Sequence, residues 1–150
     1  MQKINLISVV IPTYNHYGRD TGLSNLIESL LSKSNEKFLG EIIVIDNGNS
    51  LVASKLESVN EKIKVVSETK VGLNYARNTG VNNVNFDIIA FIDDDITVST
   101  DWASGIIAGH SNDGILCVGG AVLVDKKDSV KYPYWFSNYF LKFLFPPSFP

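Results

Sequence analysis

Residues 4–15 read INLISVVIPTYN. The first eight form an apolar, largely β-branched run that only two small polar residues interrupt, Asn5 and Ser8. Such a run is typical of a strand that is buried on both faces, as in a parallel sheet. Pro12 has no backbone N–H to donate, so we expect the strand to end at that residue.

Outward from this strand, the chain alternates between strand-like and helix-like patterns. Further strands are expected at 41–45, 63–67, 87–92 and 115–124, and helices at 23–31, 52–59, 72–84 and 101–108. This alternation predicts βαβ units with right-handed crossovers. The predicted fold class is therefore α/β, with a Rossmann-like, mostly parallel sheet and helices on both of its faces.

The composition is that of a globular domain. Of 150 residues, 45% are hydrophobic, and 13 Lys+Arg against 16 Asp+Glu give a net charge of −3. The length suits one domain of ordinary size. No basic surplus is present to neutralise phosphates, which argues against nucleic-acid binding. No signal peptide is visible, and no apolar run approaches the roughly 18 residues that cross a bilayer.

Cys117 is the single cysteine and lies in the apolar run 115–118. It is expected to be a buried structural thiol, and a lone cysteine excludes a disulfide framework. A reducing, cytoplasmic location is the corresponding expectation.

Polar and turn-forming residues follow the predicted strands. Pro12, Thr13, Tyr14 and Asn15 follow the first strand, Asp46 follows the second, and Asp93–Asp95 follow the fourth. In open α/β sheets, ligands bind beyond the carboxyl ends of the strands. We therefore expect a binding site at that edge.

The three consecutive aspartates are the strongest chemical signal. Adjacent carboxylates repel one another, and a divalent cation such as Mg²⁺ or Mn²⁺ relieves that repulsion. In an extended segment Asp93 and Asp95 would face one ligand, while Asp94 would turn aside or reach a neighbouring group. The alternative is a solvated acidic turn.

Asp46 and Arg77 each allow two interpretations. Asp46 can accept hydrogen bonds from a nucleobase or a ribose, or it can form an Asx turn with the backbone of Gly48. Arg77 can lie near phosphates or form a surface ion pair. The chain lacks both G-x-G-x-x-G and a Walker loop, which argues against dinucleotide oxidoreductases and P-loop enzymes.

Six short motifs occur in an ordered set, at 8–15, 41–48, 72–80, 90–95, 101–102 and 118–120. In this set the chain resembles the N-terminal, nucleotide-sugar-binding part of family 2 glycosyltransferases, which have the GT-A fold. The resemblance covers roughly residues 4–124. One departure is Asn47, because many relatives carry a second aspartate at that position.

The resemblance implies a role for each matching residue. The donor nucleotide would contact Pro12, Thr13, Tyr14, Asn15, Asp46, Gly72, Arg77, Asp93 and Asp94. Within this set, Pro12 and Tyr14 would pack against the base, and Asp46 would hydrogen-bond it. Gly72 would let the donor approach the backbone, and Asp93 would lie towards the ribose. Asp95, with Asp93, would hold Mn²⁺ or Mg²⁺ against the diphosphate.

The implied reaction is metal-dependent transfer of a sugar, with inversion, from a nucleoside-diphosphate sugar to a saccharide or lipid-linked acceptor. The pathway class would be polysaccharide or glycoconjugate biosynthesis. Two other interpretations stay open: a non-catalytic module that binds nucleotide or nucleotide-sugar, and a nucleotidyltransferase. The latter is less favoured, because Thr13 and Tyr14 stand where a glycine-rich and basic loop would be.

The resemblance also predicts a division of the chain. Residues 1–124 would form the nucleotide-sugar-binding half-domain, and 125–150 the aromatic-rich start of a truncated acceptor-side region. The catalytic base is then expected to be absent, because Asp125 and Asp128 follow too closely on the last strand. The aromatic segment 132–145 would pack against the missing half or make a peripheral contact with a membrane.

Overall fold

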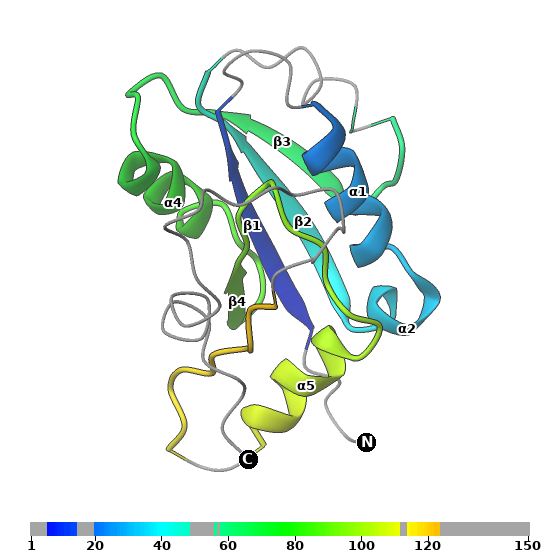
Figure 1. Ribbon diagram of the computed structural model, residues 1–150. Coiled ribbons are helices and arrows are strands. Elements are labelled where there is room, and N and C mark those ends of the chain that lie inside the picture. The colour runs from blue at the N-terminus through cyan, green and yellow to red at the C-terminus, as the bar shows by residue number, and fades with distance from the viewer. Residues whose placement is uncertain (1–5, 15–19, 49–55, 57, 112–113, 124–150) are drawn as a thin grey trace, which may run out of the picture.

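The computed structural model describes residues 6–14, 20–48, 56, 58–111 and 114–123. Its strands are β1 (Ile7–Thr13), β2 (Leu39–Asp46), β3 (Ile63–Ser67) and β4 (Ile88–Phe91). All described pairings are parallel, in the order β3-β2-β1-β4 (Figure 1). The first four predicted strands and the parallel sheet are therefore confirmed. Because β1 and β2 lie in the middle of the sheet, every residue of β1 is buried, as are Leu39 and Ile42–Ile45 of β2.

Pro12 lies inside β1, so the prediction that it ends the strand is wrong. The pairing of β1 with β4 stops at Val10, whereas its pairing with β2 continues through Thr13. Val10 accepts a hydrogen bond from the backbone of Ile92, so its polar groups face the β4 side. Pro12, two residues on, faces the same side beyond the end of β4. Its missing N–H therefore costs no ladder hydrogen bond.

The helices are α1 (Asp20–Leu30), α2 (Lys33–Glu36), α4 (Leu73–Val81) and α5 (Trp102–Gly109). One hydrophobic core joins α1 and α5 to one face of the sheet, and a second joins Ala76 of α4 to the other face. The predicted helices on both faces are thus confirmed (Figure 1). Gly80 lets α4 pack closely, because a Cβ at that position would lie 2.3 Å from the Val10 side chain.

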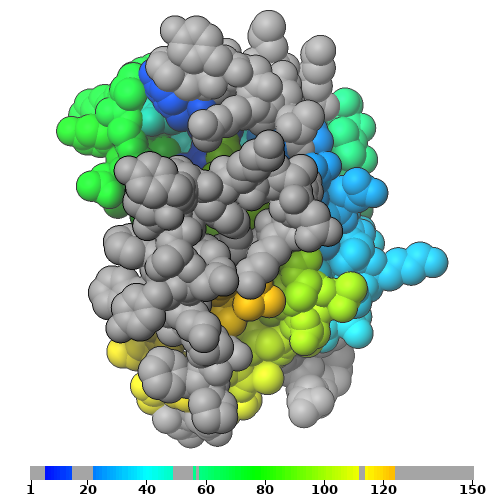
Figure 2. Space-filling view, viewed as in Figure 1, coloured from blue at the N-terminus to red at the C-terminus, as the bar shows by residue number. Residues whose placement is uncertain are grey.

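The predicted fifth strand is not formed by residues 115–123, which make no ladder with the described sheet. They run at the surface beside α5 (Figure 2), and the Leu116 side chain is 94% exposed. Val118 lies over Gly109, where an added Cβ would be 2.8 Å from its side chain. Cys117 is exposed, so the prediction of a buried thiol is also wrong. An apolar run becomes a buried strand only where a neighbouring strand pairs with it.

Some predictions fall outside the described residues. They concern Asn15, most of the helix at 52–59, residue 124 of the fifth strand, and all of 125–150 with its aromatic segment 132–145. Within the described part of the chain, no helix combines the length and apolar character needed to cross a membrane.

Candidate active site

The carboxyl ends of the strands are joined by backbone hydrogen bonds beyond the regular ladders. Asn47 donates to the Thr13 carbonyl at 3.0 Å, and Glu68 donates to the Asp46 carbonyl at 2.9 Å. The residues that follow β1, β2 and β3 are therefore held side by side. The strand ends where the sequence predicts a site are therefore adjacent in the fold.

The aspartate segment after β4 is anchored through its middle residue. The Thr13 hydroxyl donates to Asp94 Oδ2 at 2.6 Å, across 81 residues of sequence. Of the two alternatives expected for Asp94, to turn aside or to reach a neighbouring group, this contact is the second. The chain turns at Asp94 and Asp95, so the assumption of an extended segment is wrong. Helix α1 approaches this turn at Gly22, where a Cβ would lie 2.9 Å from the Asp94 carbonyl oxygen.

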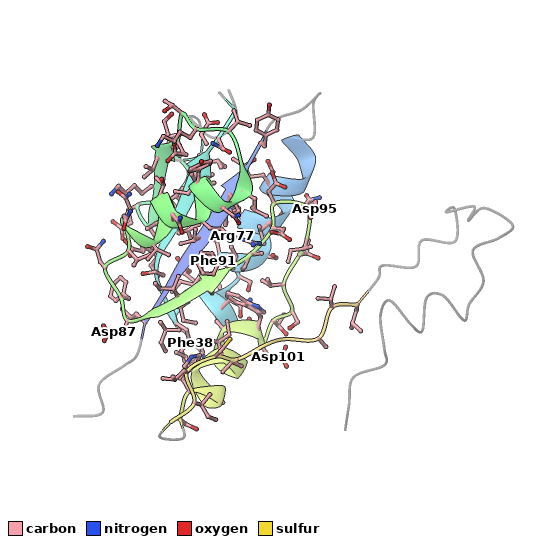
Figure 3. All side chains as sticks on the ribbon, turned by 90° about the vertical axis from the view of Figure 1, so that its left-hand side faces the viewer. Phe38, Arg77, Asp87, Phe91, Asp95 and Asp101 are labelled. Carbon is pink, nitrogen blue, oxygen red and sulfur yellow. The ribbon has the colours of Figure 1, made fainter. Side chains whose placement is uncertain are left out.

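Arg77 of α4 joins the first aspartate of the segment. Its Nη2 lies 3.2 Å from Asp93 Oδ1, and the guanidinium sits 5.9 Å from the centroid of the Phe91 ring (Figure 3). The side chains are 38% and 62% exposed for Arg77 and Asp93, respectively, so water screens the pair. The surface ion pair, one of the two interpretations of Arg77, is therefore present. Arg77 Nε has no hydrogen-bond partner among the described residues.

The residues predicted to contact the base lie next to this segment along the sheet edge. Pro12 and Thr13 are buried, and Tyr14 is 45% exposed. Asp46 is partly buried, and its Oδ1 accepts a hydrogen bond from the Gly48 backbone at 3.1 Å. That bond is the Asx turn foreseen as one of the two interpretations of Asp46.

The loop from Glu68 to Gly72 connects β3 to α4. The Glu68 carboxylate accepts hydrogen bonds from the Thr79 hydroxyl of α4 and from the Lys70 backbone. These bonds, the one from Thr79 first, lower the pKa of Glu68 below its ordinary value. Gly72 has φ +142°, a conformation that glycine adopts readily and other residues rarely do. The loop is therefore hydrogen-bonded to α4 through Glu68 and Thr79, and it ends at a position whose backbone conformation favours glycine.

Two buried asparagines were missed as structural residues. The Asn47 side chain bonds three backbone groups of the 68–72 loop. Asn35 bonds the backbones of Ser29, Ser99 and Ala103 at the other end of the sheet. Their partners lie up to 68 residues away in sequence, and no spacing rule connects them. For Asn47 the only sequence signal is its place directly after a largely apolar strand, and Asn35 offers none.

The donor set at this edge suits a hard divalent cation. Asp95 is exposed, and within the described ranges no hydrogen bond or ion pair involving its carboxylate is found. The described residues contain no group of three or more His, Cys, Asp or Glu side chains arranged around one point. Mg²⁺ and Mn²⁺ need no such cage, because one or two carboxylates with substrate and water oxygens are sufficient. The residues present therefore fit such an ion.

Comparison with known sequences identifies the family. The profile of Glycosyl transferase family 2 matches residues 8–146, which is most of the chain. The chain belongs to glycosyl transferase family 2. The chain is 27% identical over 124 residues to the glucosyl-dolichyl phosphate glucuronosyltransferase of Haloferax volcanii. It is 28% identical over 141 residues to polypeptide N-acetylgalactosaminyltransferase 8 of Drosophila melanogaster.

These matches cover 79% and 89% of this family 2 chain, but 39% and 23% of the two relatives. The chain therefore spans well under half the length of the curated relatives it matches. Two solved structures are similar, each with a TM-score of 0.56: S. aureus TarS and GalNAc-T7 with UDP, GalNAc and Mn²⁺. The sequence identities are 22% and 24%, with 69% and 65% of this chain and 31% and 19% of those chains covered. At that identity the likeness supports the GT-A fold alone.

Proposed function

We propose that the carboxyl edge of the sheet binds a nucleoside-diphosphate sugar with a divalent cation, for inverting transfer of the sugar to an acceptor hydroxyl. The arrangement of charges in the aspartate segment carries this proposal. Asp94 is held by Thr13, while Asp93 and Asp95 remain exposed on either side of it. Arg77 lies beside Asp93. Carboxylates for a cation and a guanidinium for a phosphate thus occur together.

Each charged group has a distinct role in this proposal. Asp95 would hold Mn²⁺ or Mg²⁺, with Asp93 as a second oxygen ligand or as a partner of the ribose. Arg77 donates one N–H to Asp93 and has further N–H groups, so it can also donate to a diphosphate oxygen. The bound cation would neutralise the negative charge that develops on the departing diphosphate.

The nucleobase would lie over the adjacent ends of β1 and β2. Tyr14 offers an exposed ring beside the buried Pro12, and the Asp46 carboxylate stands at the next strand end. Aromatic rings bind bases by stacking, and carboxylates accept their N–H groups. The 68–72 loop, ending at Gly72, would border the donor on the α4 side.

The acceptor is proposed to be a saccharide or a lipid-linked sugar, in polysaccharide or glycoconjugate biosynthesis. The name of the Haloferax volcanii relative, which includes dolichyl phosphate, supports a lipid-linked acceptor. The proton of the acceptor hydroxyl must pass to a base. The proposal assigns this base to none of the described residues.

Thermal unfolding with nucleoside diphosphates and nucleotide-sugars, with and without Mn²⁺, tests the proposal. A ligand of the folded state at a hundredfold excess over its dissociation constant stabilises by about 2.7 kcal/mol. We expect one nucleotide to raise the unfolding temperature only with Mn²⁺, and Asp95→Ala to abolish the shift.

Asp87→Ala is the matched control. Asp87 is an exposed aspartate at the start of β4, at the opposite end of that strand from Asp95 (Figure 3). The control should keep the full Mn²⁺-dependent shift. A folded protein that responds to no nucleotide would refute the donor site. Binding without sugar transfer or donor hydrolysis would instead favour the nucleotide-binding module.

A further inference from the structure

The Asn47 side chain has all its strong hydrogen-bonding groups engaged inside the protein. Its Nδ2 donates to the carbonyls of Glu68 at 2.8 Å and Lys70 at 2.7 Å. Its Oδ1 accepts from the Gly72 backbone at 2.7 Å. Only 5% of the residue is exposed. One buried amide therefore fixes three backbone groups along five residues of loop.

This set of partners requires an amide at position 47. Two of the partners are carbonyl oxygens, which need N–H donors, and the third is an N–H, which needs an acceptor. An ionised aspartate has the shape of asparagine but no donor, so it could keep only the Gly72 bond. It would also place a negative charge against two carbonyl oxygens. Asn47 is therefore suited to this loop in a way that its acidic counterpart is not.

The loop that Asn47 fixes leads directly into the proposed donor site. Gly72 precedes α4, and its carbonyl accepts the first helical hydrogen bond, from Ala76 at 3.1 Å. One residue later in α4 comes Arg77, the partner of Asp93. The Asn47 backbone also donates to Thr13, which holds Asp94. Asn47 thus connects both sides of the charged site without belonging to its exposed surface.

We propose that Asn47 is a positioning residue for donor binding, acting through the 68–72 loop and the start of α4. Its amide holds the Gly72 backbone and α4 in the arrangement that receives the nucleotide-sugar, and it does not itself contact the donor. This inference rests on the proposed function for the identity of the ligand. The loop-fixing part rests on the hydrogen bonds alone.

Asn35 provides a matched control, because its side chain has the same bonding pattern. It is fully buried, donates to the carbonyls of Ser29 and Ser99, and accepts from the backbone of Ala103. Asn35 lies in α2, before β2 begins at Leu39, whereas Asn47 directly follows the last residue of β2. Asn47→Leu and Asn35→Leu keep the branched side-chain shape, add no charge and remove the same three hydrogen bonds.

The experiment measures hydrogen exchange over residues 68–75 and nucleotide-sugar affinity with Mn²⁺ in both variants of the full chain. Both variants should unfold at a lower temperature than the wild type. We expect Asn47→Leu alone to speed exchange in this loop, and to weaken donor binding about tenfold, as the loss of positioning hydrogen bonds predicts. Asn35→Leu should leave both unchanged.

Several results would overturn the inference. They are unchanged loop exchange in Asn47→Leu, a loosened loop with undiminished donor affinity, or an equal loss of affinity in both variants. If the wild type binds no nucleotide, the proposed function and the donor-positioning role fail together, while loop exchange still decides whether Asn47 fixes the loop. Should Asn47→Leu fail to fold, Asn47→Asp removes only the two donated bonds, and loop exchange is then compared with Asn35→Asp.

Discussion

Two carboxylates at opposite ends of the sheet, Glu41 and Asp95, differ in their hydrogen-bond partners. At the amino end, Glu41 accepts hydrogen bonds from the Ser8 hydroxyl at 2.6 Å and from the backbone and side chain of Asn85 at 2.6 and 2.7 Å. Ser8 in turn accepts from the Phe86 backbone at 3.2 Å. At the carboxyl end, Asp93 and Asp95 are exposed after β4.

The difference separates a structural carboxylate from one available to a ligand. Partial burial raises the pKa of Glu41, but the bonds from Ser8 and Asn85, with the nearby charge of Lys64, outweigh it and leave the pKa below the ordinary value. Glu41 is thus satisfied by protein donors and ties the start of β4 to β1 and β2. Asp95 depends on water or a ligand. A carboxylate's role is set by the donors around it.

Exchanging one charge at each end should separate stability from binding. Asp95→Asn and Glu41→Gln each replace a carboxylate by an amide of the same shape. Because it loses a charged ligand of the cation, Asp95→Asn should weaken Mn²⁺-dependent nucleotide binding by about a hundredfold. Glu41→Gln should leave the affinity unchanged, as titration calorimetry can establish. Equal losses of affinity in both variants would remove the distinction between the two ends.

Deleting the amino-end carboxylate should cost stability. Glu41→Ala leaves the donors of Ser8 and Asn85 without their acceptor, which should lower the free energy of unfolding by about 2 kcal/mol. Urea unfolding measures this change. Glu61→Ala, at an exposed glutamate, is the control and should change stability by less than about 0.5 kcal/mol. A similar small change in Glu41→Ala would show that its hydrogen bonds add nothing net.

Stability should also fall in acid, partly through Glu41. Its folded-state pKa is lowered from 4.5, so its contribution is fully present above that value and is lost as the pH falls through the folded-state pKa. Unfolding in urea from about pH 6 to about pH 3 should show this loss. Glu41→Gln should have a shallower dependence. Glu68 and Asp101, whose pKa values are also lowered, would retain part of the slope.

The smallest effect on stability is expected at the carboxyl-end ion pair. Arg77 and Asp93 are both substantially exposed, so Arg77→Gln should change the free energy of unfolding by less than about 1 kcal/mol. Nucleotide affinity should fall much more, because a phosphate donor is lost. Urea unfolding and titration calorimetry on the same sample of Arg77→Gln compare its loss of stability with its loss of nucleotide affinity. A large stability loss with unchanged affinity would make Arg77 a structural residue like Glu41.

The sequence was informative where a pattern is local. The apolar runs located four strands within a few residues, and 63–67 coincides with β3. The rule that the carboxyl ends of parallel strands share one edge correctly predicts that Thr13, Asp46 and the aspartate segment lie together. These predictions succeeded because burial and strand direction depend on residues adjacent in the chain.

Contacts between distant residues could not be predicted in this way. The apolar run at 115–123 does not reveal whether a neighbouring strand is available to pair with it. The predictions of a fifth strand and of a buried Cys117 are therefore both wrong. In the sequence Asn47 is only a departure from relatives that carry an aspartate, because its three bonds become apparent only when the 68–72 loop is placed. The roles assigned to Pro12, Tyr14, Asp46 and Asp93–Asp95 in donor binding remain predictions.

Pro12 gives the sheet a fixed stopping point on one flank. Its backbone nitrogen faces the side where β4 has already ended. An extension of β4 along that flank would lack the hydrogen bond that residue 12 would otherwise donate, although the Pro12 carbonyl could still accept one. The missing N–H of Pro12 thus favours a chain that leaves the sheet at the level of the aspartates. Replacement loops between the aspartates and α5 could therefore vary widely in sequence without extending the sheet across the site.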